Sequence, residues 1–169
     1  MNASADIQLR PARVEDLAAV HALNQACRPA LGDEVLGFML HWQQQAHYFQ
    51  VAWAGDSFAG FLLGMLPDDD YGSVNFQWFR RHLDRFFYID RVAVVPAFQR
   101  RGVGRLLYHD VERWSRQRQL ERITCEVNIR PLNQDSLDFH QALGFAVVGE
   151  QDTEAGHKRV ALMVRELGA

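Results

Sequence analysis

The stretch from Phe98 to Gly104, with the sequence FQRRGVG, places two glycines and two arginines between a strand-like run and a helix-like run. Glycine lets the backbone pass close to a bulky group because it has no Cβ. The first turn of a helix presents unpaired N–H groups at the positive end of the helix dipole. This combination indicates a site for an anion, and phosphate is the anion that best suits it.

Three phosphate-binding patterns can be compared with this stretch. A P-loop requires Gly-x-x-x-x-Gly-Lys-Ser/Thr, which the sequence lacks. A dinucleotide fingerprint requires a third glycine or alanine where Leu107 stands. The pattern Gln/Arg-x-x-Gly-x-Gly/Ala is met by Gln99, Gly102 and Gly104, directly after a run that ends in Val-Pro. The alternative is that the two glycines only end a strand and begin a helix.

A carboxylate, Asp90, interrupts a strand-like run of aromatic and β-branched residues, where aspartate is disfavoured. One interpretation is a general base that takes the proton of a substrate ammonium, directly or through water. The other is a salt-bridged carboxylate beside Arg91. Glu126 is a second candidate base on the neighbouring strand, and together with Tyr88 it would instead orient a water. None of the seven histidines belongs to a zinc motif, so no metal site is expected.

Hydrophobic periodicity predicts the elements that must position these residues. Helices are expected over 14–27, 33–45, 103–119 and 134–143, and strands over 7–12, on both sides of the turn Gly55-Asp56-Ser57 within 48–66, and over 86–95, 122–127, 145–151 and 158–167. The central strand, long helix and following strand predict a right-handed crossover with parallel strands, whereas the ends look antiparallel. Segment 67–85 breaks every period and is expected to be a long loop or an irregular helical insertion, which is often functional.

Composition bounds the class of protein. A chain of 169 residues with 48% hydrophobic content fits one globular domain with a sizeable core. The formal net charge of −3 disfavours general nucleic-acid binding, which needs a basic excess. Cys27 and Cys125 lie far apart and are expected to be buried thiols in a reducing cytoplasm. No apolar run approaches the ~18 residues that span a bilayer, so no membrane segment is expected.

At the glycine motif the sequence resembles the GCN5-related N-acetyltransferase (GNAT) superfamily, in which this motif holds the pyrophosphate of acetyl-coenzyme A (acetyl-CoA). The resemblance extends to IQLRPARVEDLAAV, YIDRVAVVP, EVN and NQDSLDFHQALGF, the last of which is similar to the family's Asn-x-x-Ala-x-x-Leu-Tyr-x-x-x-Gly-Phe. It implies a single domain over residues 1–169 with an α/β (α+β) fold. In that fold a mixed, mostly antiparallel seven-stranded sheet has a central parallel strand pair and is flanked by helices.

The resemblance also implies a cofactor site. Pantetheine would lie between two splayed parallel strands, RVAVV and TCEVN, and would bind their backbone. The residues expected to contact acetyl-CoA are Val92, Ala93, Val94, Gln99, Arg100, Arg101, Gly102, Val103, Gly104, Arg105, Asn128, Asn133, Ser136, Phe139 and His140. The three arginines are also consistent with a solvated surface.

Acyl transfer to an amine needs a neutral amine, stabilisation of the tetrahedral oxyanion and a proton for the leaving thiolate. His140 occupies the position where the family motif usually carries a tyrosine thought to supply that proton. Its reference pKa of ~6.5 would suit an imidazolium donor near neutral pH. The alternatives are a thiolate that leaves unaided, or Tyr88 or Tyr108 as the donor.

Segment 71–87 is expected to form one wall of the acceptor pocket because it precedes the strand of Asp90 and is rich in aromatic residues. The residues expected to bind the acceptor are Phe76, Trp78, Phe79, Arg80 and Tyr88. Arginines here would bind a carboxylate, which indicates an amino-acid-like amine. The alternative is that Trp78 and Phe79 fill the core.

The sequence therefore predicts an acetyl-CoA-dependent N-acetyltransferase that acts on a primary amine of a small molecule or a peptide. The alternative is an acyl-CoA-binding sensor or partner module without turnover. No nucleic-acid or membrane partner is expected, and a homodimer would agree with the family, in which dimers are common.

Overall fold

The computed structural model describes residues 6–168 and shows two compact units. Unit 1 comprises residues 6–64 and 91–111, and unit 2 comprises residues 65–90 and 112–168. The boundary passes through strand β4 (Phe86–Val94) and helix α4 (Val103–Gln117), so each unit receives part of both elements.

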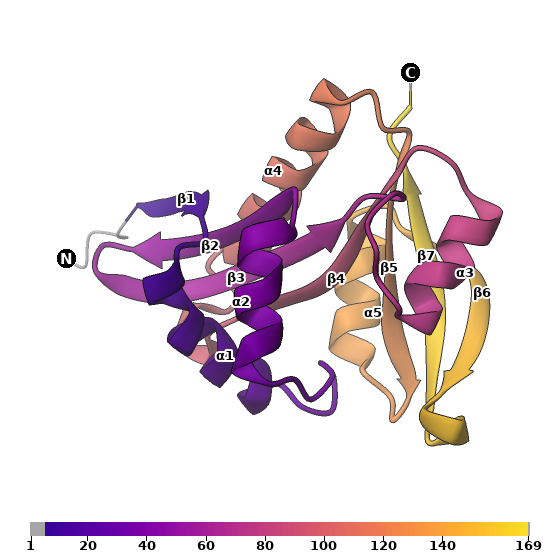
Figure 1. The fold of residues 1–169 in the computed structure, drawn as a ribbon, viewed down its shortest axis with the longest axis horizontal. Coiled ribbons are helices and arrows are strands. Elements are labelled where there is room, and N and C mark those ends of the chain that lie inside the picture. Colours follow the sequence, from indigo (N-terminus) through magenta and orange to yellow (C-terminus); the bar gives the residue numbers. More distant parts are fainter. Residues whose placement is uncertain (1–5, 169) are drawn as a thin grey trace. The chain divides into compact units, whose positions relative to one another are not determined.

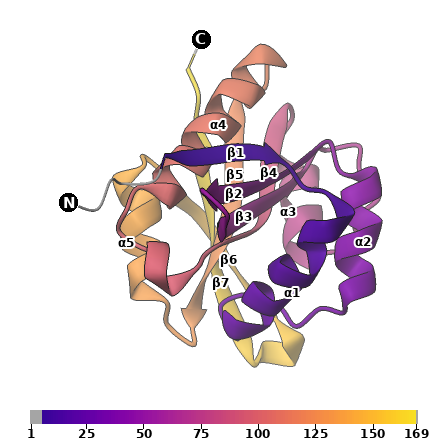
Figure 2. The same ribbon diagram turned by 90° about the vertical axis from the view of Figure 1, so that its left-hand side faces the viewer.

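Unit 1 is an antiparallel sheet with two helices on one face (Figure 2). Besides its parts of β4 and α4 it contains β1 (Ile7–Pro11), two 3-10 turns (Val14–Asp16 and Pro96–Phe98), α1 (Leu17–Ala26), α2 (Leu36–Gln45), β2 (Tyr48–Ala54) and β3 (Ser57–Met65), of which only the last residue belongs to unit 2. The predicted hairpin is confirmed, since β2 and β3 pair antiparallel on either side of a turn in which Gly55 has a φ of +59°. Helices α1 and α2 pack against each other and lie side by side (Figure 1).

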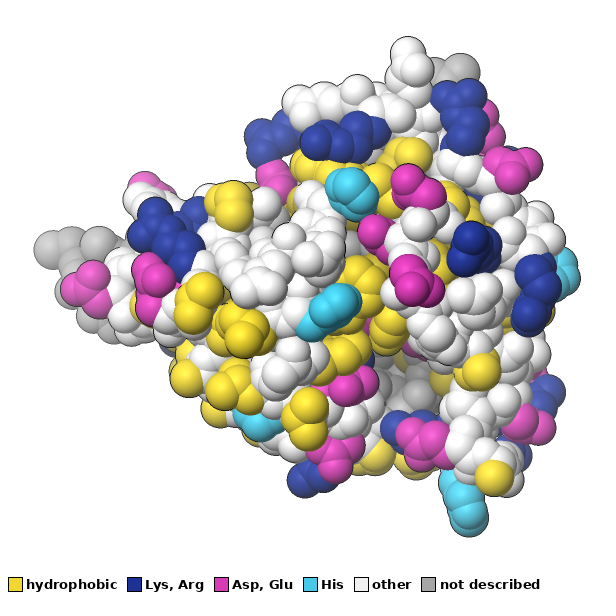
Figure 3. Space-filling view, viewed as in Figure 1, with side chains coloured by type: hydrophobic (Ala, Val, Ile, Leu, Met, Phe, Trp, Pro, Cys, Tyr) yellow, Lys and Arg dark blue, Asp and Glu magenta, His cyan; other side chains and the backbone are white. Residues whose placement is uncertain are grey.

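The helical side of unit 1 leaves part of its apolar surface exposed. Four apolar residues here are exposed to solvent: Val14, Val35, Leu36 and Leu40. Val35 is 72% exposed. Figure 3 shows hydrophobic side chains gathered over the region of α1 and α2. The hydrophobic periodicity of α1 and α2 therefore predicts more complete burial of their apolar side chains than the structure shows.

A buried guanidinium ties β4 to α1, α2 and the connection between them in unit 1. Arg91 is only 5% exposed and donates to Oδ1 of Asn24 at 2.9 Å. It also pairs with Glu34 at 3.4 Å and lies over the Phe38 ring at 4.5 Å. Successive strand side chains point to opposite faces, so the side chains of Arg91 and Asp90 diverge.

Gly60 permits a close backbone approach inside unit 1. A Cβ at this position would lie 2.5 Å from the carbonyl oxygen of Ala93, a distance that requires the backbone to shift. We expect Gly60→Ala to lower the free energy of unfolding by about 1–3 kcal/mol, as overpacking typically does. Urea denaturation measures this loss, with Gly32→Ala as the control because a Cβ at Gly32 meets nothing within 4 Å. Equal losses in the two variants would contradict the steric explanation.

Unit 2 contains a strand layer in which β4 pairs with a parallel neighbour. Its other elements are α3 (Val74–His82), β5 (Arg122–Arg130), α5 (Gln134–Ala142), β6 (Ala146–Thr153) and β7 (Lys158–Glu166). The parallel β4–β5 ladder runs from Phe86↔Arg122 to Tyr88↔Thr124, and β7 pairs antiparallel with both β5 and β6. The strand order β1-β2-β3-β4-β5-β7-β6 confirms the predicted mixed, mostly antiparallel seven-stranded sheet with one parallel pair.

The irregular segment before β4 contains a regular helix, α3. It begins after Ser73, whose Oγ accepts a hydrogen bond from the N–H of Phe76 at 3.4 Å, as N-cap residues do. Phe76 and Phe79 are fully buried and pack on the aromatic rings of Phe86 and Tyr88. Of the two structures expected for segment 67–85, a long loop or a helical insertion, the helical insertion is therefore the one observed.

Both cysteines are free thiols; Cys125 is buried and Cys27 is partly buried. Between residues 6 and 168, no helix is both long enough and apolar enough to cross a membrane.

Candidate functional site

The glycine motif in unit 1 forms a strained loop that leads into α4. Two of its residues have positive φ angles, +60° at Arg100 and +84° at Gly102. Gln99 donates from its side-chain amide to the carbonyl oxygen of Val94 at 3.2 Å, so it holds the loop to the end of β4. Helix α4 begins at Val103, and its first N–H groups therefore lie at the end of this loop.

Space and positive charge surround this loop. A Cβ at Gly102 would meet no atom within 4 Å. Arg100, Arg101 and Arg105 are exposed, and within residues 6–168 none of them has an ion-pair partner; Arg101 only lies over the Phe98 ring at 5.8 Å. Uncommitted guanidiniums beside a helix N-terminus fit the phosphates of acetyl-CoA.

The predicted pantetheine contacts lie on the part of β4 that belongs to unit 1. Ala93 is buried, whereas Val92 and Val94 are partly exposed. The carbonyl oxygen of Val94 already accepts from Gln99. Val103 and Tyr108 of α4 are almost completely buried, so their side chains belong to the core.

Two tyrosine–carboxylate pairs form the acid–base cluster of unit 2. The Tyr71 hydroxyl donates to Oδ1 of Asp90 at 2.7 Å. The Tyr88 hydroxyl lies 2.8 and 2.7 Å from the two carboxylate oxygens of Glu126. The rings of Tyr71 and Tyr88 are 6.5 Å apart, so the two pairs are neighbours.

Tyr88 stays protonated in this environment. Burial raises its pKa well above the usual value of 10, and the negative charges of Glu126 and Asp90 raise it further. A hydroxyl that keeps its proton donates steadily to Glu126. The predicted pairing of Tyr88 with Glu126 therefore has a geometric basis.

Asp90 and Glu126 lie where the parallel strands stop pairing in unit 2. Tyr88↔Thr124 is the last pair of this ladder within the described residues of the unit, and each carboxylate comes two residues later on its strand. Residues two apart point to the same face of a strand, so Asp90 shares a face with Tyr88. The end of a parallel ladder is a favourable place for a ligand.

His140 is buried in α5 as an uncharged ring. It is 4% exposed and lies against the rings of Phe139 and Phe145. Its Nδ1 is 2.7 Å from the carbonyl oxygen of Ser136, so Nδ1 carries the ring proton and donates it. Burial lowers the pKa of His140 below 6.5, although the hydrogen bond to Ser136 acts in the opposite direction. This direction opposes the imidazolium that the proton-donor hypothesis requires.

The lowered pKa of His140 predicts that stability falls as the solution becomes acidic. Well above pH 6.5 this ring is uncharged in both the folded and the unfolded state. As the pH falls through 6.5 the unfolded chain binds the proton first, so the free energy of unfolding decreases until the folded ring also titrates. The slope from this one group is at most about 1.4 kcal/mol per pH unit. Denaturation at several pH values measures it.

The variant His140→Phe removes the titrating ring and keeps an aromatic side chain of similar shape. We expect its stability to depend less steeply on pH below 6.5 than that of the parent protein. His157→Gln is the control because His157 is exposed on the same unit. A variant His140→Phe with the same slope as the parent would show that this ring does not set the pH dependence.

The remaining residues predicted on this side of the cofactor organise α5. The Asn133 side chain caps the helix by accepting from the N–H of Ser136 at 3.3 Å. The N–H of Asn133 donates to the carbonyl oxygen of Asn128 at 3.0 Å, and the side chain of Asn128 is buried. Through these contacts the asparagines fix the helix that follows β5. Phe139 is partly exposed.

The structure corrects the aromatic wall expected for the acceptor. Phe76 and Phe79 have no exposed surface, so both belong to the core and offer nothing to an acceptor. Trp78 is partly exposed but covers Gly149 of β6, where a Cβ would lie 3.3 Å from the indole ring. Arg80 is exposed and, within the described chain, forms no ion pair.

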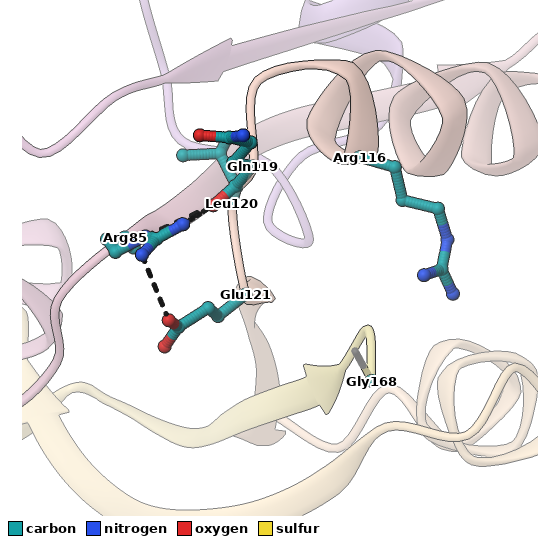
Figure 4. Close-up of a pocket in the computed structure, with 6 residues that line it drawn as sticks. All are labelled: Arg85, Arg116, Gln119, Leu120, Glu121 and Gly168. Atoms are coloured by element: carbon teal, nitrogen blue, oxygen red, sulfur yellow. Dashed lines mark hydrogen bonds and ion pairs between the residues drawn. The ribbon is translucent and has the colours of Figure 1, made fainter.

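A surface hollow of about 390 Å³ also lies on unit 2. Figure 4 shows Arg85 extending to Gln119 and Glu121 on one side of it, and Arg116 extending from α4 on the other. Arg85 and Glu121 precede β4 and β5, whereas Asp90 is the fifth residue of β4, about 16 Å along the strand. The hollow is therefore remote from the acid–base cluster.

One member of the cluster, Tyr71, is not among the candidate residues predicted from the sequence. Tyr71 lies 19 positions before Asp90 in a segment without periodicity, so no local pattern indicates that it donates to this carboxylate. Its only signal is membership of the segment expected to line the acceptor site.

Comparison with known proteins agrees with this geometry. Residues 17–145 match the Acetyltransferase (GNAT) family. None of the curated proteins compared with the chain matches it.

Solved structures share the fold at low sequence identity. The chain is similar to Ard1 from Thermoplasma volcanium, with a TM-score of 0.78 and 18% identity over 96% of this chain and 99% of that chain. It is similar to the ribosomal-protein-S18-alanine N-acetyltransferase from Escherichia coli, with a TM-score of 0.73 and 15% identity over 97% and 96% of the two chains. It is also similar to yncA from Salmonella typhimurium, a putative acetyltransferase solved with acetyl-CoA, with a TM-score of 0.72 and 21% identity over 97% and 95%. The family match spans most of the chain and includes residues of both units, so the chain belongs to the GNAT acetyltransferase family and is an acyltransferase that uses acetyl-CoA.

Proposed function

We propose that the protein transfers an acetyl group from acetyl-CoA to a primary amine of a small molecule or a peptide by direct attack of the amine. The observation that carries this proposal is the pair of carboxylates, Asp90 and Glu126, placed where the parallel ladder ends and each bonded to a tyrosine. When bound, acetyl-CoA supplies the thioester that the amine attacks. The other steps follow from side chains of this chain.

In unit 1 the arginines and the start of α4 hold the phosphates in this proposal. Arg100, Arg101 and Arg105 have no ion-pair partners in the described chain, so anion binding breaks no existing pair. The positive end of α4 adds to their attraction. The positive φ angles at Arg100 and Gly102 shape the loop for an anion.

In unit 2 Asp90 is the proposed base. An ammonium must lose a proton before it attacks, and a carboxylate within reach of the amine, directly or through one water, accepts it. The Tyr88 hydroxyl lies within hydrogen-bond distance of both carboxylate oxygens of Glu126. This contact fixes the orientation of the carboxylate and suits it to hold a water or the ammonium. The two carboxylates thereby take different parts in binding and proton transfer.

The cysteines support direct attack over an acyl-enzyme. Burial, followed by the charge of Glu126, raises the pKa of Cys125 well above 9. Burial also raises the pKa of Cys27. A nucleophilic cysteine needs a lowered pKa, so neither thiol is suited to accept the acetyl group.

His140 is not the proton source in this proposal. Its ring is uncharged near neutral pH, and the one ring proton is donated to Ser136. A thiolate is a much weaker base than an alkoxide or an amide anion, so it leaves without much help from an acid. His140 then packs between Phe139 and Phe145 and supports α5.

The layout of α3 favours an extended acceptor. Arg80 lies six residues beyond the first residue of α3, about 9 Å along its axis, whereas Tyr71 at Asp90 precedes the helix. An acceptor with its amine at Asp90 and a carboxylate at Arg80 would have to separate the two groups by several bonds. A peptide or an elongated amine meets this requirement better than a free α-amino acid.

Thiol release from acetyl-CoA with a panel of amines tests the function. The panel contains free amino acids, linear diamines and short peptides with free N-termini. We expect release above background with at least one extended amine. Binding of acetyl-CoA without release for every amine would support the alternative, a sensor or partner module.

A further inference from the structure

We propose that Tyr71 is a positioning residue for the transfer reaction, and that its hydroxyl holds the carboxylate of Asp90 in the orientation that receives the proton. This inference rests on the proposed role of Asp90 as the base. It assigns a function to the insertion between β3 and β4, which carries Tyr71 to the strand of Asp90.

The backbone around Tyr71 is held by its own hydrogen bonds. Asp69 accepts from the N–H of Leu66 at 2.7 Å, and the N–H of Tyr71 donates to the carbonyl oxygen of Asp69 at 3.0 Å. The Gln77 side chain on α3 donates to the carbonyl oxygen of Tyr71 at 2.7 Å. The backbone of Tyr71 is therefore held by Asp69, which precedes it, and by Gln77, which follows it.

The Tyr71 ring is held by α3. Its centroid lies 5.7 Å from Phe76 and 6.5 Å from Tyr88, and Phe76 itself lies 5.4 Å from Tyr88. Phe76 is fully buried, so it provides a rigid support on which both tyrosines pack. A buried phenylalanine thus has an indirect part in the site, because it orients both hydroxyls.

Two titratable groups of unit 2 interact with Asp90: Tyr71 donates a hydrogen bond to it, and the charge of Asp90 raises the pKa of Tyr88. Two carboxylates at the end of one strand pair repel each other, and each is bonded to a different hydroxyl. A hydrogen bond to an ionised carboxylate is stronger than one between neutral groups and favours the charged form. Removing the Tyr71 hydroxyl should therefore disturb the orientation of the base.

Tyr71→Phe tests the inference because it removes the hydroxyl and keeps the ring. We expect kcat to fall about 10-fold or more, with the KM for acetyl-CoA unchanged. In the background of Asp90→Asn, adding Tyr71→Phe should cause no further loss.

Tyr48→Phe is the matched control. The Tyr48 hydroxyl donates to Oδ2 of Asp110 at 2.8 Å, so this variant removes the same kind of bond in unit 1. It should lower thermal stability and leave kcat as in the parent. A parent-like kcat in Tyr71→Phe, or a loss no larger than in Tyr48→Phe, would overturn the inference.

The failure of this inference and that of the proposed function are distinguishable. If Asp90→Asn keeps parental turnover, Asp90 is not the base, so the inference fails while the proposed acetyl transfer stands. If Asp90→Asn is inactive and Tyr71→Phe is parental, only the role of Tyr71 fails. If no amine gives turnover, the carboxyl ¹³C chemical shift of Asp90 still reports the bond in resting protein: it should change in Tyr71→Phe and not in Tyr48→Phe, and an unchanged chemical shift would overturn the inference.

Discussion

Asp90→Asn should lower kcat by about 10²–10⁴-fold, the range typical for loss of a general base. The amide keeps the size of the side chain and still accepts from Tyr71, so the fold and the tyrosine contact should persist. Asparagine cannot take up the proton of an ammonium. The KM for acetyl-CoA should stay near the parental value, and steady-state thiol release measures both constants.

The control for this variant is Asp84→Asn, an exposed aspartate just before β4. It removes the same charge without changing the acid–base cluster, and its kcat should be parental. Glu126→Gln provides a comparison within the cluster. A larger loss in Glu126→Gln than in Asp90→Asn would reverse the assignment of the base.

Gly102→Val should weaken acetyl-CoA binding by about 10-fold or more. Gly102 has a φ of +84°, and a β-branched residue in this region costs about 1–3 kcal/mol of backbone strain. Because a Cβ here would meet no atom within 4 Å, the cost comes from the backbone angle and not from a clash inside the protein. A loop that relaxes to relieve this strain no longer directs its amides at the phosphates. Calorimetry measures the affinity.

Gly55→Val is the matched control because Gly55 also has a positive φ, +59°, in the β2–β3 turn, with open space around it. Both substitutions should lower stability by similar amounts. Only Gly102→Val should change the affinity for acetyl-CoA. Unchanged affinity in a folded Gly102→Val protein would remove the loop from the cofactor site.

Local patterns determined the elements of this fold. Alternating aromatic and β-branched residues around Gly55 and Asp56 predicted the hairpin, and the Val-Pro end of β4 followed by two glycines predicted a strand, a loop and a helix. These features depend on neighbours in the chain, through turn conformation and side-chain period. The glycine motif belongs to the same class, because its glycines and arginines are adjacent in sequence.

Helix α3 also has local sequence patterns that predict a helix. Ser73 is an N-cap residue, and Phe76 and Phe79 are three positions apart, as on one helical face. Arg80, Arg81 and His82 occupy the last turn, where basic residues are favoured. The turn residues just before the helix obscured this pattern.

Tertiary structure alone decided which side chains meet. Tyr88 and Glu126 are 38 positions apart, and Tyr71 and Asp90 are 19 apart, so no local period connects either pair. The sequence by itself identified Asp90, Glu126 and His140 as groups able to move protons. Burial in the folded chain then decided which side chains are charged and which are accessible. It left His140 uncharged, kept the proton on Tyr88 and made Phe76 and Phe79 core residues. A side chain's exposure and charge depend on everything packed around it, and that packing exists only in the folded chain.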